Sequence, residues 1–313
     1  MKTKTVEELL KVSKTTLLQR IKNYNLDIPK TQSGQNIFKW EHIIKLTFLE
    51  KYSYINNLNC KVMTISQNKG GVGKTTSVIN LGTGLSYIGK TLLIDLDSQG
   101  NLSQAFDLYL TNDQKSVSDV FDDPDNFEIA VIKINPNLHI LPNSLKFEKW
   151  KRTNRNDTKS PFILKKILKN IKNNYNFILI DTPPALDFAL HIALYASQFC
   201  LIPIEPHPFA LDGISNIIEE IEYIGSNDAI ADFNLKILGV FINLFEKNTL
   251  NEQIAETVKE NFNTFETKIK KAVAVQQSQA LKKAIFEHDE ASQVSYDYYN
   301  LLFEILERLI GEG

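Results

Sequence analysis

Residues 62–76, VMTISQNKGGVGKTT, decide the fold. Apolar residues lead into a glycine-rich loop, and a helical pattern follows the loop, which is the context of a phosphate-binding loop. The spacing G-x-x-x-x-G-K-[ST] is met at Gly73, Lys74 and Thr75, whereas Asn68 stands where the first glycine is expected. The stretch predicts a nucleotide-binding α/β protein.

The residue types of this loop suit a nucleoside triphosphate. Glycines let backbone N–H groups approach phosphates closely, and the N-terminus of the following helix adds positive charge. We expect Lys74 to reach the β- and γ-phosphate oxygens and Thr75 to bind Mg²⁺. We therefore predict ATP and Mg²⁺ as cofactors, and the predicted nucleotide-binding residues here are Gly70, Gly71, Val72, Gly73, Lys74, Thr75 and Thr76.

Beyond residue 60, short apolar segments alternate with helical ones. Strands are expected at 62–66, 91–95, 138–141, 177–181, 199–204 and 237–243, and helices at 74–87, 161–173, 211–224, 250–261 and 292–309. Most of the strands lack strict alternation, which is typical of a parallel sheet covered on both faces. The pattern predicts a doubly wound, mainly parallel α/β fold. The polar stretches 111–126 and 151–160 are expected to be exposed loops or short helices.

A second lysine, Lys69, opens the loop, and the run K-G-G-V-G-K-T-T resembles the deviant Walker A motif of the ParA/MinD family. In that family the extra lysine crosses a nucleotide-sandwich dimer to touch the partner's ATP. The resemblance implies that Lys69 is this signature lysine, that the protein forms a homodimer, and that Asn68 in place of glycine is normal.

Two segments with aspartates extend the resemblance. Residues 95–101, DLDSQGN, resemble the family's D-x-D-P-Q-G-N switch, with Ser98 in the place of proline. This implies that Asp97 orients the attacking water or influences Mg²⁺ and that Asp95 supports the metal shell. Asp181, which opens the segment DTPP after an apolar strand, resembles the Walker B aspartate that holds a metal-bound water.

The segment around Asp97 or the segment after Asp181, taken alone, could be a turn or a helix cap. Together with the phosphate loop, however, they make three motifs that each follow a predicted strand, where α/β proteins bind ligands. The predicted catalytic residues are Lys69, Lys74 and Asp97, and the predicted metal-site residues are Thr75, Asp95 and Asp181.

Four further segments also resemble the ParA/MinD family, so that the resemblance covers about residues 60–310. They are 137–142 (NLHILP), 201–206 (LIPIEP), 210–213 (ALDG) and 239–243 (GVFIN). The last is similar to the strand whose asparagine contacts adenine, which implies that role for Asn243. An Asx turn at the strand end is the alternative for this residue.

Residues 1–59 differ in charge from the rest of the chain. They hold 10 Lys+Arg and 5 Asp+Glu, a net charge of +5, whereas the remainder has 25 and 32, a net charge of −7. A first helix capped by Thr5, a second at 14–24 capped by Ser13, a strand at 37–40 and a third helix at 41–51 are expected. We predict a winged helix-turn-helix DNA-binding domain with a linker at 1–59, containing Asn56-Asn57, and a ParA-type ATPase domain at 60–313.

Longer plasmid-partition ParA proteins carry such a domain and use it to bind their operator. The second helix would present Ser13, Thr15, Thr16, Gln19, Arg20 and Lys22, types that contact phosphates and base edges. Arg20 and Lys22 are the candidate DNA contacts. A helical unit for dimerisation or partner docking is the alternative.

ParA-type segregation ATPases also bind DNA non-specifically through basic residues towards the C-terminal side of the dimer. The candidates here are Lys247, Lys270 and Lys271, with Lys268, Lys282 and Lys283 nearby. Relatives usually carry arginine in these segments, and a solvated helix face is the alternative.

Cysteine content and the distribution of apolar and charged residues bear on the metal content, compartment and membrane association of the protein. Cys60 and Cys200 are too far apart for a disulfide framework or a zinc cluster, and Cys60 precedes the loop, which argues against a shared iron–sulfur cluster. No signal peptide or run of about 20 apolar residues is found, so we expect a cytoplasmic protein associated with the nucleoid. Residues 299–313 are amphipathic, but Glu304, Glu307 and Glu312 oppose Arg308 alone, and an acidic face is repelled by anionic lipid.

The sequence thus predicts an ATPase that segregates a plasmid or chromosome, with a ParB-like partner stimulating hydrolysis on DNA. The alternatives are an ATP-gated transcriptional repressor and a positioning ATPase for a non-DNA cargo.

Overall fold

An eight-stranded sheet forms the centre of the protein, and its strand order is β3-β4-β2-β5-β1-β6-β7-β8. The computed structural model describes residues 1–48, 59–111, 113–226 and 233–311. The strands are β1 Lys61–Ile65, β2 Thr91–Asp95, β3 Ile132–Asn135, β4 Leu138–Leu141, β5 Phe177–Asp181, β6 Phe199–Ile204, β7 Lys236–Phe245 and β8 Thr264–Lys270. Neighbouring strands pair in parallel, except that β3 is antiparallel to β4. The predicted mainly parallel α/β fold is confirmed.

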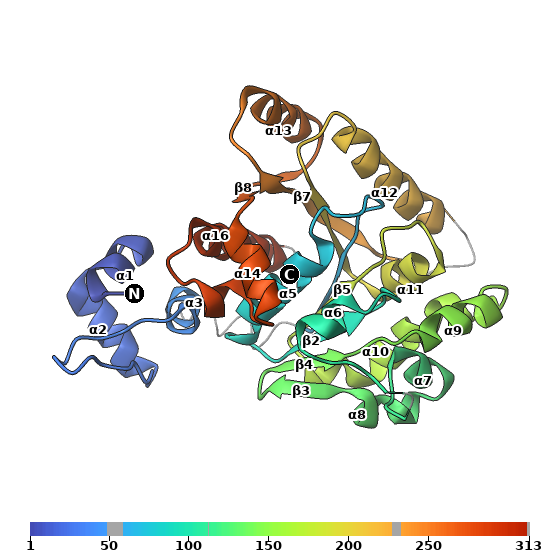
Figure 1. Cartoon of the computed structure of the whole chain (residues 1–313), viewed down its shortest axis with the longest axis horizontal. Helices are drawn as coiled ribbons and strands as arrows, with labels where there is room; N and C mark the ends of the chain where they lie inside the picture. The colour runs from blue at the N-terminus through green and yellow to red at the C-terminus, as the bar shows by residue number, and fades with distance from the viewer. Residues whose placement is uncertain (49–58, 112, 227–232, 312–313) are drawn as a thin grey trace.

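Helices cover both faces of this sheet (Figure 1). They are α5 Lys74–Ser86, α6 Asn101–Ala105, α7 Val117–Asp122, α8 Phe127–Ala130, α9 Lys146–Asn154, α10 Ile163–Ile171, α11 Phe188–Ala196, α12 Ala210–Gly225, α13 Thr249–Asn261, α14 Val273–Ala280, α15 Ile285–His288 and α16 Gln293–Gly311. Short 3-10 turns lie at Pro124–Asn126, Ser160–Phe162 and Lys172–Asn174. The five helices predicted in this part of the chain all form, each within two residues of its expected start and end.

Alternate residues of the strands explain why both faces are covered. In β1, Met63 and Ile65 pack into the cluster that contains α5 and α16, whereas Val62 packs with α10 and α11. In β6, Cys200 and Ile202 pack against α12 and α13. β2, β4, β5 and β6 are buried at every position and are mostly apolar, as the sequence indicated, whereas the edge strands β3 and β8 are partly exposed and carry lysines.

The strand order brings the three predicted motifs together. β5 pairs with β1 on one side and with β2 on the other, and all three strands run in the same direction. The phosphate loop, the segment around Asp97 and the segment after Asp181 therefore leave the same edge of the sheet side by side, as ligand-binding loops do in this class of fold.

The N-terminal unit, residues 1–48, contains α1 Thr3–Leu10, α2 Lys14–Asn23 and α3 Trp40–Phe48. Ser13 caps α2 as predicted, since its side chain accepts from the Thr16 N–H, but α1 already begins at Thr3, so Thr5 is not its cap. The strand predicted at 37–40 does not form: Trp40 starts α3, and an antiparallel bridge between Lys30 and Asn36 stands where a wing was expected.

The winged form of the predicted helix-turn-helix domain is therefore not confirmed. The end of the predicted third helix and the Asn56-Asn57 linker lie outside the described residues.

Trp40 attaches the N-terminal unit to the rest of the protein. Its ring is fully buried among Phe286, Tyr296 and Tyr299, with ring centroids 5.6, 5.0 and 5.1 Å away, and its Nε1–H donates to the Glu290 carbonyl at 3.0 Å. In Figure 1 the N-terminal unit accordingly lies beside α14 and α16. A residue of the predicted DNA-binding domain thus belongs to the hydrophobic core of the sheet domain.

No described helix has the length and apolar character needed to span a bilayer.

We expect Trp40→Ala to lower the free energy of unfolding by about 3–5 kcal/mol, because it removes a large buried side chain from a packed core. Ile37→Ala is the matched control, since Ile37 is 38% exposed and surface changes cost about 0.5 kcal/mol or less. Denaturant unfolding measures both. Equal stabilities of the two variants would contradict the docking of the N-terminal unit through Trp40.

Candidate functional site

The phosphate loop joins β1 to α5, and its glycines adopt a backbone that other residues avoid. Gly71 has φ +78° and Gly73, which precedes α5, has φ +86°. Both values lie in the left-handed region, where a Cβ would be strained. A Cβ on Gly73 would also lie 2.2 Å from Nδ2 of Asn243. The loop therefore keeps its N–H groups at the start of α5, where they can bind an anion.

Lys74 and Thr75 follow at the start of α5. The Lys74 ammonium donates to the Lys69 carbonyl at 3.1 Å, which closes the loop. Burial lowers the pKa of Lys74, and the negative charges of Asp181 and Asp97 oppose this shift. The Thr75 hydroxyl donates to Oδ2 of Asp181 at 2.7 Å. The predicted Walker A residues and the predicted Walker B aspartate are thus in direct contact.

Asp181 is fully buried, and its second oxygen, Oδ1, has no hydrogen-bond partner among the described residues. Burial, followed by repulsion from Asp95, raises the pKa of Asp181 well above its ordinary value. A buried carboxylate oxygen without a donor, beside a threonine hydroxyl, suits the water shell of a hard cation such as Mg²⁺. The residues present therefore fit the predicted metal.

Asp95 and Asp97 have different surroundings. Asp97 lines the pocket in front of the loop. Asp95 is fully buried, and its oxygens accept hydrogen bonds from the Ser103 N–H at 2.9 Å, the Ser103 hydroxyl at 2.6 Å and the Asp97 N–H at 3.1 Å. Burial raises the pKa of Asp95 to about 7 despite these donors. In this structure Asp95 holds the Asp97 segment and α6 in place and does not line the pocket.

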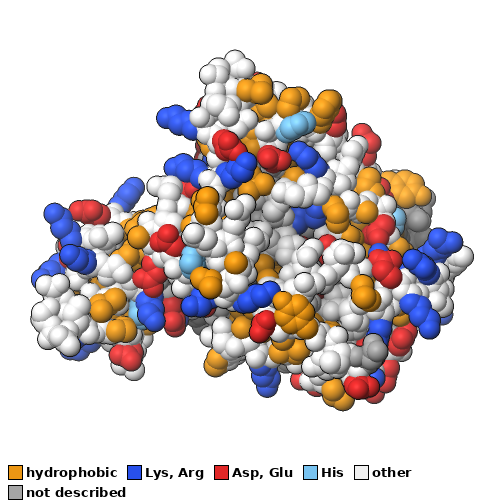
Figure 2. Space-filling model, in the orientation of Figure 1, with side chains coloured by type: hydrophobic (Ala, Val, Ile, Leu, Met, Phe, Trp, Pro, Cys, Tyr) orange, Lys and Arg blue, Asp and Glu red, His pale blue; other side chains and the backbone are white. Residues whose placement is uncertain are grey.

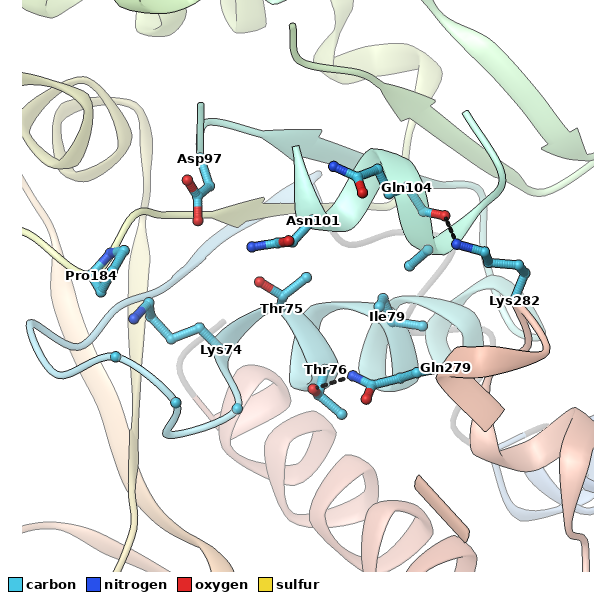
Figure 3. A pocket seen from close by; sticks show the side chains of 14 residues that line it. Lys74, Thr75, Thr76, Ile79, Asp97, Asn101, Gln104, Pro184, Gln279 and Lys282 are labelled. Carbon is cyan, nitrogen blue, oxygen red and sulfur yellow. Dashed lines mark hydrogen bonds between the residues drawn. The ribbon is translucent and has the colours of Figure 1, made fainter. Parts of the chain in front are cut away.

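A pocket of about 410 Å³ opens in front of the loop (Figure 3). One wall is the loop and α5, a second is Asp97 with α6, and a third is formed by residues near α14. Across it, the Gln279 amide donates to the Thr76 hydroxyl at 2.8 Å and the Lys282 ammonium donates to the Gln104 carbonyl at 2.8 Å.

The pocket residues Asn101, Gln104 and Gln279 were not predicted as site residues. Asn101 ends the quoted segment 95–101, whereas Gln104 and Gln279 belong to no quoted motif, and a neutral amide side chain alone gives no signal for such a role. Lys282 was noted only as part of a basic cluster.

Lys69 lies on the outer side of the loop. Its side chain is 43% exposed, and its ammonium is 3.3 Å from a carboxylate oxygen of Glu205. A half-exposed lysine on a weak surface ion pair can exchange its partner at little cost.

Asn243 lies behind the loop at the end of β7. It is buried, and its Nδ2 donates to the Val72 carbonyl at 2.8 Å. The structure thus gives Asn243 a role in shaping the phosphate loop, and its contact with adenine stays a prediction.

The candidate DNA-binding residues lie in two regions. On α2, Lys22 is exposed, whereas Arg20 is half-buried with its Nε inside the protein. Lys247 and Lys270 are exposed near the ends of β7 and β8, and Lys271 pairs with Glu246 at 2.5 Å. Figure 2 shows many Lys and Arg side chains over the N-terminal unit, at the left of the molecule.

The fold and the pocket define a P-loop nucleotide-binding protein. Residues 60–237 match a family model described as an AAA domain. The chain is 31% identical over 250 residues to sporulation initiation inhibitor protein Soj of Bacillus subtilis, an alignment that covers 78% of this chain and 98% of Soj. It is 29% identical over 255 residues to chromosome partitioning protein ParA of Caulobacter vibrioides, covering 79% and 94%. The chain belongs to the ParA/Soj family of P-loop ATPases.

Solved structures show the same fold. A variant of McdA from Cyanothece, in complex with ATP, superimposes with a TM-score of 0.71 at 21% identity, covering 80% of this chain and 97% of that one. Cobyrinic acid a,c-diamide synthase of Mycobacterium smegmatis, with a bound ATP analogue and magnesium, gives a TM-score of 0.69 at 20% identity, covering 81% and 97%.

We expect Gly73→Ala to destabilise the protein and weaken nucleotide binding. The positive φ alone costs about 1–2 kcal/mol for alanine, and Asn243 leaves no room for the methyl group. Gly70→Ala is the matched control, because the nearest atom to its Cβ is 3.9 Å away. Thermal unfolding of the nucleotide-free variants compares them, and an unchanged melting temperature for Gly73→Ala would contradict the loop conformation.

Lys74→Ala should weaken ATP binding about 10- to 100-fold, because a charge-assisted hydrogen bond contributes about 1.5–3 kcal/mol. Lys69→Ala should leave the affinity of the monomer nearly unchanged, since that side chain lies outside the pocket. Titration of dilute protein with a fluorescent ATP analogue measures both constants. Normal affinity in Lys74→Ala would rule out the phosphate-loop assignment.

Proposed function

We propose that the protein is an ATP-dependent DNA partition ATPase. One observation carries the proposal: in a chain of the ParA/Soj family, Lys74, Thr75 and Asp97 line one pocket, and the Thr75 hydroxyl donates to the buried Asp181 behind it. Two relatives that match over nearly their whole length are described as chromosome partitioning protein ParA of Caulobacter vibrioides and as a virulence plasmid ParA family protein of Chlamydia psittaci.

Hydrolysis in this pocket would depend on positioning and charge neutralisation. The Lys74 ammonium and the loop N–H groups would hold the phosphates, and Thr75 with Asp181 would hold Mg²⁺ and its water. Bound Mg²⁺ would neutralise charge on the phosphate oxygens. Asp97, at the pocket wall, would orient the attacking water. Asp95 would keep Asp97 in place through its hydrogen bond to the Asp97 N–H.

The ATP-bound form would be a sandwich homodimer. The half-exposed Lys69 supports this, because its surface ion pair with Glu205 could be exchanged for a phosphate of the partner's nucleotide. A ParB-like partner would then stimulate hydrolysis and separate the subunits, which would remain in the cytoplasm on the nucleoid.

Two surfaces support DNA binding. Lys247 and Lys270 are exposed and could bind DNA phosphates without regard to sequence. At the N-terminal unit, a groove is lined by Lys2, Lys4, Lys14 and Lys30, with no acidic residue among its described lining. This groove lies near the exposed polar side chains of α2 and supports operator binding by the N-terminal unit.

Asp97→Ala should keep ATP binding and lower the hydrolysis rate roughly 100-fold or more, the typical contribution of a group that handles the reacting water. The exposed Asp113→Ala is the control. Phosphate release measures the rate, and an Asp97→Ala variant as active as the control would place the catalytic aspartate elsewhere.

DNA binding should require ATP and weaken with salt, because each phosphate contact contributes about 0.9 to the slope of log affinity against log salt. Replacing both Lys247 and Lys270 with alanine should lower that slope by about 2, whereas the exposed Lys149→Ala should not change it. Fluorescence anisotropy with non-specific duplex DNA gives the slopes. Absence of binding at low salt would favour a non-DNA cargo, and binding only to one operator sequence would favour a repressor.

A further inference from the structure

Lys282 has an unusual backbone conformation beside the nucleotide pocket. It follows the end of α14, and its φ of +55° lies in the left-handed region, where the residue after a helix is usually glycine. The Cβ of any other residue is crowded in this conformation, and such outliers gather at sites that bind ligands. Lys282 is also one of the residues that line the pocket in front of the phosphate loop. Its side chain therefore calls for a functional explanation.

Neutral groups hold the Lys282 ammonium at the pocket wall. It donates to the Gln104 carbonyl at 2.8 Å and to the Tyr109 hydroxyl at 3.0 Å, and it lies 5.3 Å from the centre of the Tyr109 ring. No carboxylate among the described residues pairs with it. Because an ammonium has three N–H donors, one remains for a further acceptor. Lys282 thus presents a fixed positive charge that the protein does not neutralise.

The charge of the pocket lining depends on Lys282. Among the described lining residues, two carry an ammonium group, Lys74 and Lys282, and one carries a carboxylate, Asp97. Without Lys282 the charged side chains of the lining would cancel, whereas with it they leave one positive charge. An excess of positive charge suits a ligand with several phosphates, and hydrogen bonds between charged groups are the stronger ones.

Lys282 and Lys74 lie at opposite ends of the pocket (Figure 3). At the Lys282 end, the hydrogen bond from the Gln279 amide to the Thr76 hydroxyl brings α14 against the first turn of α5. The Lys74 end, which Asp97 shares, is where the β- and γ-phosphates are expected. The rest of a nucleotide in this pocket would extend away from them, so its α-phosphate end would lie towards Gln279 and Lys282.

We propose that Lys282 is a nucleotide-binding residue that contacts the α-phosphate end of ATP and ADP alike. The proposal rests on the proposed ATPase function for the identity of the nucleotide. When nucleotide binds, the unused N–H of Lys282 would donate to a phosphate oxygen. Its bond to the Gln104 carbonyl would at the same time hold α6, the helix that follows Asp97, against the bound nucleotide.

The test uses Lys282→Gly, because glycine suits a φ of +55° and so removes the ammonium without straining the backbone. This variant should bind a fluorescent ADP analogue about tenfold more weakly than the parent, as expected for a lost hydrogen bond to a charged group. Lys282→Arg should keep most of the affinity. Lys283→Met is the matched control, since Lys283 is exposed and outside the described lining of this pocket. Titrations are run below the melting temperature of every variant, and parent-like affinity in Lys282→Gly would show the proposal to be wrong.

A second titration locates the contact. Lys282→Gly should lose the same factor with a non-hydrolysable ATP analogue as with the ADP analogue, whereas Lys74→Ala should lose more with the ATP analogue. A loss confined to the ATP analogue would place Lys282 at the γ-phosphate and overturn the proposal. A smaller salt slope of DNA binding with parent-like nucleotide affinity would make Lys282 a DNA contact instead. These titrations need no turnover, so a parent protein that binds nucleotide without hydrolysing ATP would refute the proposed function alone.

Discussion

Two carboxylates lie side by side at the carboxyl ends of two adjacent strands, and much of the site follows from this constraint. Asp95 and Asp181 are register partners on the adjacent strands β2 and β5, and both are fully buried. Like charges so close together, away from water, each disfavour the ionised form of the other. Each therefore needs donors: Ser103 and the Asp97 N–H serve Asp95, and Thr75 serves Asp181.

The donors are unevenly shared, and this gives the two aspartates different roles. Asp95 accepts hydrogen bonds through both oxygens, from the Asp97 N–H and the Ser103 N–H, and so fixes the backbone between these two residues. Asp181 keeps one oxygen without a partner among the described residues, next to the threonine that begins α5. A cation bound there would weaken the repulsion between the two carboxylates. Nucleotide and metal would thus supply the positive charge that the Asp181 oxygen does not receive from the protein.

Much of this could be predicted from the sequence because local patterns determine it. The limits of β2, β4, β5 and β6 were predicted without error, since buried parallel strands are short apolar runs with sharp ends. β8 was missed because lysines and a glutamate interrupt Thr264–Lys270, at the edge of the sheet. The hydrogen bonds from Gln279 to Thr76 and from Lys282 to Gln104 across the pocket depend on which segments the fold brings together, and spacing along the chain does not encode them.

The same limit applies to the residues of the site. The loop residues and Asp181 could be located from their motifs. By contrast, the Asp95 side chain points into the protein because Ser103 donates to it, and Asn243 fits behind the loop because Gly73 has no side chain. The net charge of residues 1–59 is reflected in the lysine-lined groove of the N-terminal unit, but it gave no sign that Trp40 belongs to the core of the sheet domain.

Because Trp40 is buried in the sheet domain, the basic surface of the N-terminal unit ends at a different point of the chain from the segment that folds separately from the sheet domain. The basic surface is carried by α1, α2 and the turn after them, while α3 supplies part of the hydrophobic core over α15 and α16. A sheet domain cut at residue 60 would lack Trp40 and expose the aromatic side chains that surround it. A fragment beginning just before α3 would keep Trp40 and leave those side chains covered, so a chimaera that exchanges the basic surface between such proteins would have to join the chains ahead of Trp40.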